Sequence, residues 1–513
     1  MFILDPWFVY LIFLFFVLSM FIAVILRLLK RVTIQKNGAF LALNGTTQLN
    51  RDLKEFDITM VGVGSMIGST VFIIIGLTAG RAGPSLLMAF LFNGFITLLS
   101  AMVYAELGSA IPEAGGGYLW IHSSMGKFQA FLSGWMAWYG HIVAGSLYAL
   151  TFASFFVFLL QELGFVVSNA LTVRVIVAVV AILIFLFINY LGTSETGLAG
   201  NIVTVSQLVI ISVFVLGGFF AIFRHPLTSF QNLVPVFPNG LDQLILAMGF
   251  VFIAFEGYEI IVQSGEEVIN PPRSIPRAIF FSLLVVIPVY FFVGFVSLAG
   301  IISPAGQTTW QFLGSFGEEG LIEAAKQFMP LGAALLFVGG LVSALSALNA
   351  TIFSSARVSF AMGRDKFLPG SFGTVNKWRR TPHIGIIFSG VIMITVAVLL
   401  PIEDVVAAAD LMFLILFLQV NLSVLIIRKR YGDRLGYGFK TPFFPWVPIA
   451  GMILEFLLIV ILIIELPLAF IGTLFWIILG IAIWLLLLRE KVSKTSKHNV
   501  LEKYIIPRED KND

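Results

Sequence analysis

Long apolar segments separated by short polar ones make up almost the whole chain. The hydrocarbon core of a bilayer is about 30 Å thick, so about 20 consecutive apolar residues form a helix that crosses it. This pattern predicts about thirteen transmembrane helices joined mostly by short connections. They are expected at 6–29, 57–80, 85–111, 127–161, 171–191, 199–223, 242–263, 277–301, 329–361, 383–401, 404–427, 445–465 and 467–488.

Two of these predicted helices are interrupted in their middle by glycine and polar residues. The sequence Gly62-Val63-Gly64-Ser65-Met66-Ile67-Gly68-Ser69 interrupts the first, and Ile253-Ala254-Phe255-Glu256-Gly257-Tyr258-Glu259 interrupts the second, roughly 190 residues later. Backbone groups freed inside the membrane are tolerated only where they line a cavity or meet a ligand. Breaks in corresponding places of two repeats are typical of secondary transporters and predict a binding site.

The two breaks also organise the chain. Apart from the first helix, two sets of five helices remain, each beginning with a broken helix, and two further helices follow. Because five is odd, the second set enters the membrane from the opposite side, which makes the repeats inverted. We therefore expect an all-α polytopic membrane protein with a five-plus-five inverted-repeat core. Its expected parts are an extra N-terminal helix (1–31), a cytoplasmic linker (32–56), the first repeat (57–223), the second repeat (242–427), two C-terminal helices (445–488) and a cytoplasmic tail (489–513).

Composition narrows the function classes. With 59% hydrophobic and 12% charged residues and a mean hydropathy of +1.00, the chain is not an ordinary soluble protein. It has no Cys and five His, and no His/Asp pattern has metal-ligand spacing, so we expect neither an enzyme nor a certain metal site. The glycine-rich stretch 112–118 lacks the Lys-Ser/Thr ending of a phosphate-binding loop, so no nucleotide and no cofactor are expected.

The basic residues are unevenly distributed along the chain. If 57–80 runs outward, the clusters at 27–54, 127, 273–277, 364–380, 428–440 and beyond 489 all lie on one side, opposite Arg81, Arg174, Arg224 and Lys326. An excess of Lys and Arg marks the cytoplasmic side. This predicts an outside N-terminus and a cytoplasmic C-terminus, in a multi-pass protein of the plasma membrane. Because the basic residues are juxtamembrane, no nucleic-acid partner is expected.

The first break offers hydrogen-bond donors. Glycine permits the backbone conformations of a break, and the helix that begins after it presents free N–H groups and a positive dipole end, which suit a carboxylate. The glycines concerned are Gly62, Gly64 and Gly68, and Ser65 and Ser69 add hydroxyl donors. The alternative is that these glycines form a close-packing seam between helices. The presence of the second break favours a binding site.

The second break offers acceptors and two carboxyl groups. The carbonyl end of its first half-helix suits an ammonium group, so the two breaks together predict a site for a zwitterion. Glu256 and Glu259 lie in or next to the break, and an ionisable side chain at this depth usually lines a polar pathway. Either residue is a candidate proton carrier; the alternative is a carboxylate that bonds the amides freed by the break. We expect Glu256 to contact the substrate or its water, whereas Glu259 fits both roles equally.

Other polar residues in the spans are weaker candidates. Glu106 and Asp57 lie near the inner ends of their spans and are interpreted as gate or packing residues. His141 and Tyr148 share one span, where they either face the pathway or pack in the interior; for the lone His we favour packing.

Five stretches together resemble the amino acid/polyamine/organocation transporter superfamily over about residues 50–490. They are Gly62–Gly68, Pro112–Tyr118, Phe255–Glu259, Glu266–Arg273 and Arg357–Pro369. The resemblance implies a leucine-transporter-like fold with discontinuous first and sixth core helices. It implies that Val63, Gly64 and Ser65 receive the substrate carboxylate, and that Ile253, Ala254 and Glu256 surround its amino group and side chain. Gly68 and Phe255 complete the expected site.

The chain departs from this resemblance at two positions. Similar proton-coupled members often carry a Lys in the fifth core helix, where alignment on Asn201 and Thr204 places Gln207. Gln carries no positive charge, so a mechanism based on that Lys is in doubt. A sodium-like site with hydroxyls such as Ser343 or Ser346 is an alternative. Glu256 is the second departure, since its position is often apolar; it favours a cationic or amine substrate or an internal proton carrier.

These observations predict secondary active transport of amino acids by alternating access, driven by an ion gradient, with the proton favoured over Na⁺, or by exchange. The alternative within the same fold is an importer or exchanger of polyamines or other amines. The expected partners are an amino acid or amine substrate, H⁺ or Na⁺, and the lipid bilayer.

Overall fold

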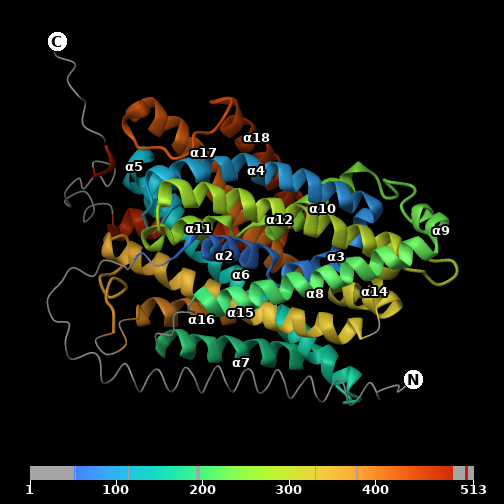
Figure 1. The fold of residues 1–513 in the computed structure, drawn as a ribbon. Coiled ribbons are helices and arrows are strands. Elements are labelled where there is room, and N and C mark those ends of the chain that lie inside the picture. Colours follow the sequence, from blue (N-terminus) through green and yellow to red (C-terminus); the bar gives the residue numbers. More distant parts are fainter. Residues whose placement is uncertain are drawn as a thin grey trace, which may run out of the picture.

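The computed structural model describes residues 51, 53–113, 115–167, 169–191, 197–329, 331–376, 379, 381–488 and 503–505. The predicted N-terminal helix, the linker up to residue 50 and most of the predicted tail lie outside the described residues. Most of the described chain is helical (Figure 1).

The helices, numbered from α2, are α2 (Glu55–Ile67), α3 (Thr70–Ala82), α4 (Leu86–Ala110), α5 (Gly117–Met125), α6 (Lys127–Glu162), α7 (Ala170–Leu191), α8 (Gly197–Arg224), α9 (Pro226–Gln231), α10 (Leu241–Val251), α11 (Tyr258–Gln263), α12 (Pro271–Ala299), α13 (Thr309–Ser315), α14 (Gly320–Phe328), α15 (Gly332–Arg364), α16 (His383–Leu399), α17 (Ile402–Tyr431), α18 (Trp446–Glu465) and α19 (Pro467–Ile483). Short 3₁₀ or π turns are η1 (Gly83–Ser85), η2 (Phe252–Phe255), η3 (Gly265–Glu267), η4 (Gly317–Glu319), η5 (Gly432–Arg434) and η6 (Trp484–Leu488).

The all-α membrane fold expected from hydropathy is confirmed. Within the described residues, ten segments are long and apolar enough to cross a bilayer, of which 55–110 contains both the broken first helix and α4. The shorter apolar helix α16 fills the span expected at 383–401. Three predicted connections contain helices of their own: α5 follows the glycine-rich stretch, α9 lies between α8 and α10, and α13 and α14 lie in the loop after α12.

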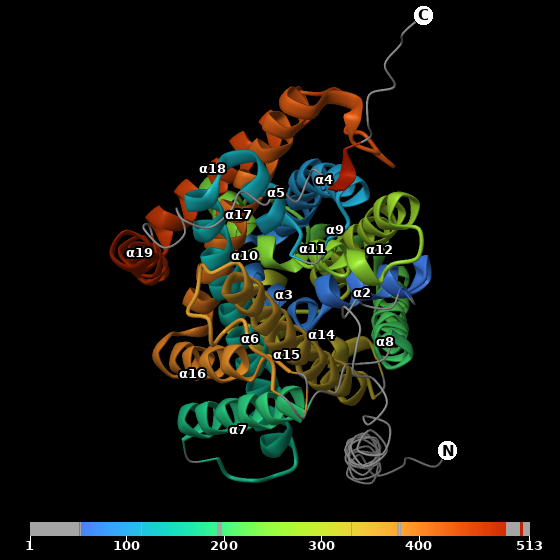
Figure 2. The same ribbon diagram turned by 90° about the vertical axis from the view of Figure 1, so that its left-hand side faces the viewer.

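The two broken helices lie side by side at the centre of the bundle and run in opposite directions. α2 contacts α11, and α3 contacts α10, so the start of one broken helix lies beside the end of the other. Viewed along the bundle, α2, α3 and α11 are surrounded by α4, α12, α8, α15, α6 and α17 (Figure 2). The arrangement agrees with two broken helices that enter from opposite sides, while the inverted repeat itself and its boundaries remain a prediction.

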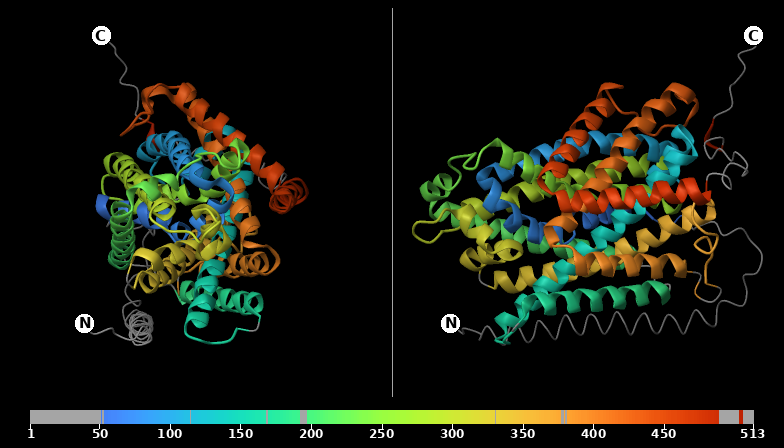
Figure 3. Two further views of the ribbon diagram at one scale, coloured as in Figure 1. Left: turned by 90° about the vertical axis from the view of Figure 1, so that its right-hand side faces the viewer. Right: turned by 180° about the vertical axis from the view of Figure 1, so that it is seen from behind.

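Helices in the centre and at the periphery differ in burial. In the most apolar stretch of α6, and of the segment from α10 to α11, 83% of residues are buried inside the protein, whereas in α7 only 17% are. α7, α16 and α19 lie on the outside of the bundle (Figures 2 and 3). Exposed apolar side chains on α7, such as Phe187, suit contact with lipid rather than with protein.

Candidate functional site

The first break is shorter than the sequence pattern suggested. Gly62, Gly64 and Ser65 still belong to α2, and the chain turns only at Gly68 and Ser69, before α3 begins. Gly68 has a φ of +39°, a conformation that other residues rarely adopt. Of the three glycines predicted to need special backbone angles, only Gly68 has them.

Gly62 and Gly64 instead allow close contact between helices. A Cβ atom on Gly62 would lie 2.5 Å from Ile261 of α11, and one on Gly64 would overlap the hydroxyl oxygen of Thr204 on α8. These contacts agree with the close-packing alternative for the two residues.

The second break lies where it was expected. The 3₁₀ turn η2 ends at Phe255, Glu256 is extended, and Gly257 has a φ of +130° before α11 begins. A Cβ atom on Gly257 would lie 2.7 Å from the Ser65 hydroxyl oxygen and 2.9 Å from the backbone nitrogen of Met66. Glycine is therefore needed here both for its backbone angles and for the approach of α2.

A direct hydrogen bond joins the two halves of the site. The Ser65 hydroxyl lies within hydrogen-bonding distance of the carbonyl oxygen of Gly257, at 3.1 Å, and of the carbonyls of Val61 and Gly62 in its own helix, at 2.7 and 3.1 Å. The Tyr290 hydroxyl of α12 donates to the carbonyl of Met66 over 3.0 Å, which holds the end of α2 against the same region. Two segments almost two hundred residues apart thus form one local structure.

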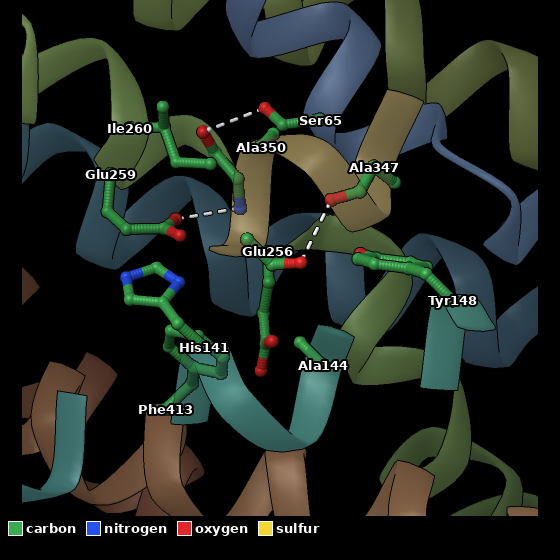
Figure 4. A pocket seen from close by; sticks show the side chains of 12 residues that line it. Ser65, His141, Ala144, Tyr148, Glu256, Glu259, Ile260, Ala347, Ala350 and Phe413 are labelled. Carbon is green, nitrogen blue, oxygen red and sulfur yellow. Dashed lines mark hydrogen bonds between the residues drawn. The ribbon is translucent and has the colours of Figure 1, made fainter. Parts of the chain in front are cut away.

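A cavity lies beside this junction (Figure 4). Its volume is about 30 Å³, and because a buried water needs about 10–15 Å³, it holds one or two waters. The end of α2 and the second break contribute to it, together with α6, α15 and α17. It is lined by Ser65, His141, Ala144, Tyr148, Glu256, Gly257, Glu259, Ile260, Ala347, Ala350, Thr351 and Phe413.

Glu259 satisfies a backbone group of the break. Its carboxylate accepts a hydrogen bond of 2.7 Å from the backbone N–H of Gly257. This contact is the structural role considered for Glu259, and it fixes the side chain at the edge of the cavity. His141 also borders the cavity, and its Nε2 lies 3.3 Å from the side-chain nitrogen of Gln263.

Glu256 has a different environment. Its side chain points away from Ser65 (Figure 4), and one of its carboxyl oxygens has no hydrogen-bond partner among the described residues. It lies within hydrogen-bonding reach of the carboxyl group of Asp410 on α17. Asp410 is fully buried, and it was missed in the sequence although it is the lone charged residue between positions 405 and 420. The reasoning that singled out Glu256 would have found it.

The first break also has unused donors near the cavity. Ser69, the residue before α3, is fully buried, and its hydroxyl has no partner within the described part of the chain. Tyr148, which lines the cavity, lies beside Thr70 at the start of α3. The positive end of α3 therefore lies close to the cavity wall.

Gln207 is connected to the first break. Its side-chain nitrogen donates to the Ser343 hydroxyl over 2.5 Å, and that hydroxyl in turn donates to the carbonyl oxygen of Gly68. Ser346 is half-buried on the same helix as Ser343. A neutral amide therefore lies where the resemblance implied a cation. Among the described residues there is no cluster of three or more His, Asp or Glu side chains that could hold a metal ion.

The remaining predicted site residues lie in the packed interior. Val63, Ile253, Ala254 and Phe255 are all at most 1% exposed. Their side chains surround the breaks, whereas Ser65, Glu256 and Glu259 reach the cavity.

Polar contacts at one end of the bundle lie apart from this cavity. Arg428 of α17 forms a two-pronged ion pair with the fully buried Glu106 of α4, with distances of 2.5 and 2.7 Å. Asn201 donates to Asp57 over 2.7 Å. Both predicted inner-end acids are therefore paired, in agreement with gate or packing roles.

Known proteins are similar in sequence to this chain over most of its length. The model of the amino acid permease family matches residues 53–487. The branched-chain amino acid permease BcaP of Bacillus subtilis is 28% identical over 88% of this chain and 95% of its own. The methylthioribose transporter of the same organism is 28% identical over 90% and 97% of the two chains. The serine/threonine exchanger SteT, also of Bacillus subtilis, is 30% identical over 77% of this chain and 87% of its own.

The match to the family model spans both broken helices, the cavity between them and every described span. It also agrees with the family resemblance of the glycine and glutamate motifs. A permease family is a family of transporters and not of enzymes. The chain belongs to the amino acid permease family.

Proposed function

We propose that the protein carries amino acids across the plasma membrane by alternating access, with the substrate held between the two breaks. The observation that carries this proposal is the contact of Ser65 with Gly257, because it joins the end of the first half-helix to the second break at the wall of one cavity. Membership of the family and the relatives that transport amino acids support the substrate class.

The orientation of the substrate follows from the charges at the two breaks. The start of α3 offers free N–H groups, the Ser69 hydroxyl and a positive dipole end, which suit the α-carboxylate. The carbonyl end of η2 and the nearby Glu256 suit the α-ammonium group. The predicted contacts of Val63, Gly64, Ser65 and Gly68 with the carboxylate, and of Ile253, Ala254 and Phe255 with the rest of the substrate, belong to this proposal.

The small cavity bears on the transport cycle. A volume of about 30 Å³ holds a water or two but not an amino acid. In the described conformation the space is too small for the substrate, so binding requires the helices around the breaks to move apart. Outward and inward opening around one central site is the essence of alternating access.

For the energy source, we propose an ion gradient, with the proton favoured, or exchange. Gln207 carries no charge, and it donates to the Ser343 hydroxyl, which donates to the Gly68 carbonyl.

A second candidate is the transport of amines. The carboxyl groups of Glu256 and Glu259 favour it, because two acidic groups beside the cavity suit a substrate with additional positive charge. The relatives differ in what their names say they carry, so the family alone does not choose between these substrates.

Thermal unfolding of the purified protein with a panel of amino acids, their amides and the corresponding decarboxylated amines tests the proposal. A ligand that binds the folded state raises the melting temperature by mass action. We expect stabilisation by amino acids that is lost with amides and amines. Stabilisation by amines alone would assign the second candidate, and no stabilisation by any compound would contradict both.

The variant Ser65→Ala tests the site itself. Loss of one hydroxyl at a buried polar contact costs about 1–2 kcal/mol, so the affinity for the stabilising amino acid should fall about tenfold. Ser206→Ala is the matched control, because Ser206 also bonds a carbonyl of its own helix but lies exposed on α8. Unchanged affinity in Ser65→Ala, or an equal loss in both variants, would remove Ser65 from the site.

A further inference from the structure

Two carboxyl groups in the interior of the bundle face each other without a cation between them. Glu256 belongs to the second break and is 6% exposed, whereas Asp410 belongs to α17 and is 0% exposed. Both oxygens of Asp410 and one of Glu256 have no hydrogen-bond donor among the described residues. The side chains are within hydrogen-bonding reach of each other.

The groups around the pair do not neutralise it. From α6 it faces His141 and Tyr148, from α11 Tyr258 and Glu259, and beyond these lie Tyr104 of α4 and Glu455 of α18. None of these is a Lys or Arg, and within the described chain neither carboxylate has an ion pair with one. His141 already contacts Gln263.

This geometry restricts what the pair can hold. Two adjacent carboxylates away from water repel each other strongly, and they become stable when they share one proton, as paired aspartates do in other proteins. A shared proton also supplies the donor that the unpaired oxygens lack. An ammonium group would bind between the two carboxyl groups only after they move apart, because in the described conformation they are within hydrogen-bonding reach of each other.

The pair is also placed where movement would change it. Glu256 lines the cavity and lies in the extended residue between η2 and α11, whereas Asp410 lies behind it within the continuous helix α17. Motion of the broken helix relative to α17 would separate the two carboxyl groups. Once apart, each binds a proton independently, and cavity water provides the path to Glu256.

We propose that Glu256 and Asp410 form the proton-binding site of this transporter, which takes up one proton from the cavity on one side of the membrane and releases it on the other. The proposal rests on the transport function proposed above and names its coupling site. The proton is bound as the O–H of one carboxyl group and bonded to the other carboxylate; on release it passes to cavity water, and both groups stay chemically unchanged.

The test uses the full chain reconstituted in liposomes, with a radiolabelled mixture of the protein amino acids as the probe. Uptake is measured under an imposed pH gradient with the membrane potential held at zero, and proton movement is followed with a pH dye inside the vesicles. One proton per substrate supports at most about tenfold accumulation for a gradient of one pH unit, because one unit is a factor of ten. We expect wild-type protein to accumulate the probe and to acidify the lumen together with it.

The variants Asp410→Asn and Glu256→Gln should lose gradient-driven accumulation, so the ratio of inside to outside probe should fall to about one. Glu455→Gln is the matched control, because Glu455 is an equally buried carboxyl group whose partners are Ser100 and Asn421. It should keep the wild-type ratio. Accumulation that persists in both pair variants would overturn the proposal.

Further outcomes separate the two proposals. If the wild-type protein binds and exchanges amino acids but moves no protons, the proton site fails while the transport function stands. If it neither binds nor exchanges the probe, the proposed function itself fails. A change of preference from cationic to neutral amino acids in Glu256→Gln, with proton movement intact, would make the pair a substrate contact and overturn its assignment as the coupling site.

A measurement on the wild-type protein covers the case in which a variant does not fold. Infrared difference spectra between acidic and alkaline buffer should show a protonated-carboxyl band that persists at neutral pH. Its absence at neutral pH would contradict a shared proton.

Discussion

Asp410 and Glu455 are both fully buried acidic residues of C-terminal helices, yet their surroundings differ completely. Glu455 accepts hydrogen bonds from the Ser100 hydroxyl and from Asn421, the latter over 3.1 and 3.2 Å. Asp410 has no donor for either oxygen among the described residues and faces another carboxyl group. A buried acid is therefore not a functional residue by itself; what distinguishes the two is whether the fold supplies donors.

Glu106 is a third case, in which a cation supplies the charge balance. Its side chain is fully buried and receives two bonds from Arg428 and one of 2.8 Å from the backbone N–H of Thr441. Glu106 thus belongs to a complete ion pair, and Glu455 accepts hydrogen bonds from neutral donors. Asp410 belongs to a pair of carboxyl groups without a cation. The predicted effects of mutation follow that order.

Arg428→Met should give the largest loss of stability. It leaves the Glu106 carboxylate buried without its cation, which costs about 3–5 kcal/mol in buried pairs, and the melting temperature should fall accordingly. The double variant Glu106→Gln/Arg428→Met should recover most of this loss, because it removes the uncompensated charge. Equal melting temperatures of the single and double variants would show that packing of the Arg side chain, rather than charge, sets the loss.

Asn421→Leu should have an intermediate effect. It removes the donor that bonds both oxygens of Glu455, and an unsatisfied buried polar group costs about 1–3 kcal/mol. Thermal unfolding in detergent measures the loss. Adding Glu455→Leu to this variant should restore stability, and a further loss of the same size would contradict the network interpretation.

Asp410→Asn should behave in the opposite way. The change removes an acid that has no donor of its own, and the new amide group can donate to Glu256. We expect the melting temperature to stay the same or rise, while Glu455→Gln lowers it. A loss in Asp410→Asn as large as that in Asn421→Leu would indicate that Asp410 has partners outside the described residues.

Two acids outside the membrane spans extend the comparison to pH, with the smallest expected effects. Burial raises the pKa of Glu319 in η4 to about 7, and the neighbouring Glu318 and Glu323 add to this shift. Burial also acts on Glu113, but hydrogen bonds from Lys503 and Tyr504 outweigh it, so the pKa of Glu113 is lowered.

The signs of these two contributions are opposite. Folded protein holds the Glu319 proton more tightly than unfolded protein does, so this contribution to stability is present below about pH 4.5 and is lost as the pH rises to about 7. Glu113 stabilises above its unfolded pKa and loses that contribution as the pH falls. Melting curves of Glu319→Gln should show less decline between pH 4.5 and 7, and those of Glu113→Gln less decline on acidification. Slopes identical to wild type would mean that neither group changes its proton affinity on folding.

The sequence by itself determined the membrane class, the positions of the spans that the structure describes, and the second break. These depend on properties that are local in the chain: the length of an apolar run is fixed by bilayer thickness, and a carboxyl group beside a glycine within such a run favours a break there. The same reasoning extended the first break too far, because glycine has two uses. Gly68 turns the chain, whereas Gly62 and Gly64 remain helical and admit Ile261 and Thr204, and that choice depends on which helix lies opposite.

Only the tertiary structure decided which polar groups meet. Ser65 bonds Gly257, Gln207 reaches Gly68 through Ser343, and Asp410 faces Glu256, each across more than a hundred residues of chain. The sequence shows which side chains are polar, but the partners of each side chain depend on the packing of distant helices. In a membrane interior, where water cannot supply a missing donor or cation, those partners decide whether a carboxyl group is a structural element or a site for a proton.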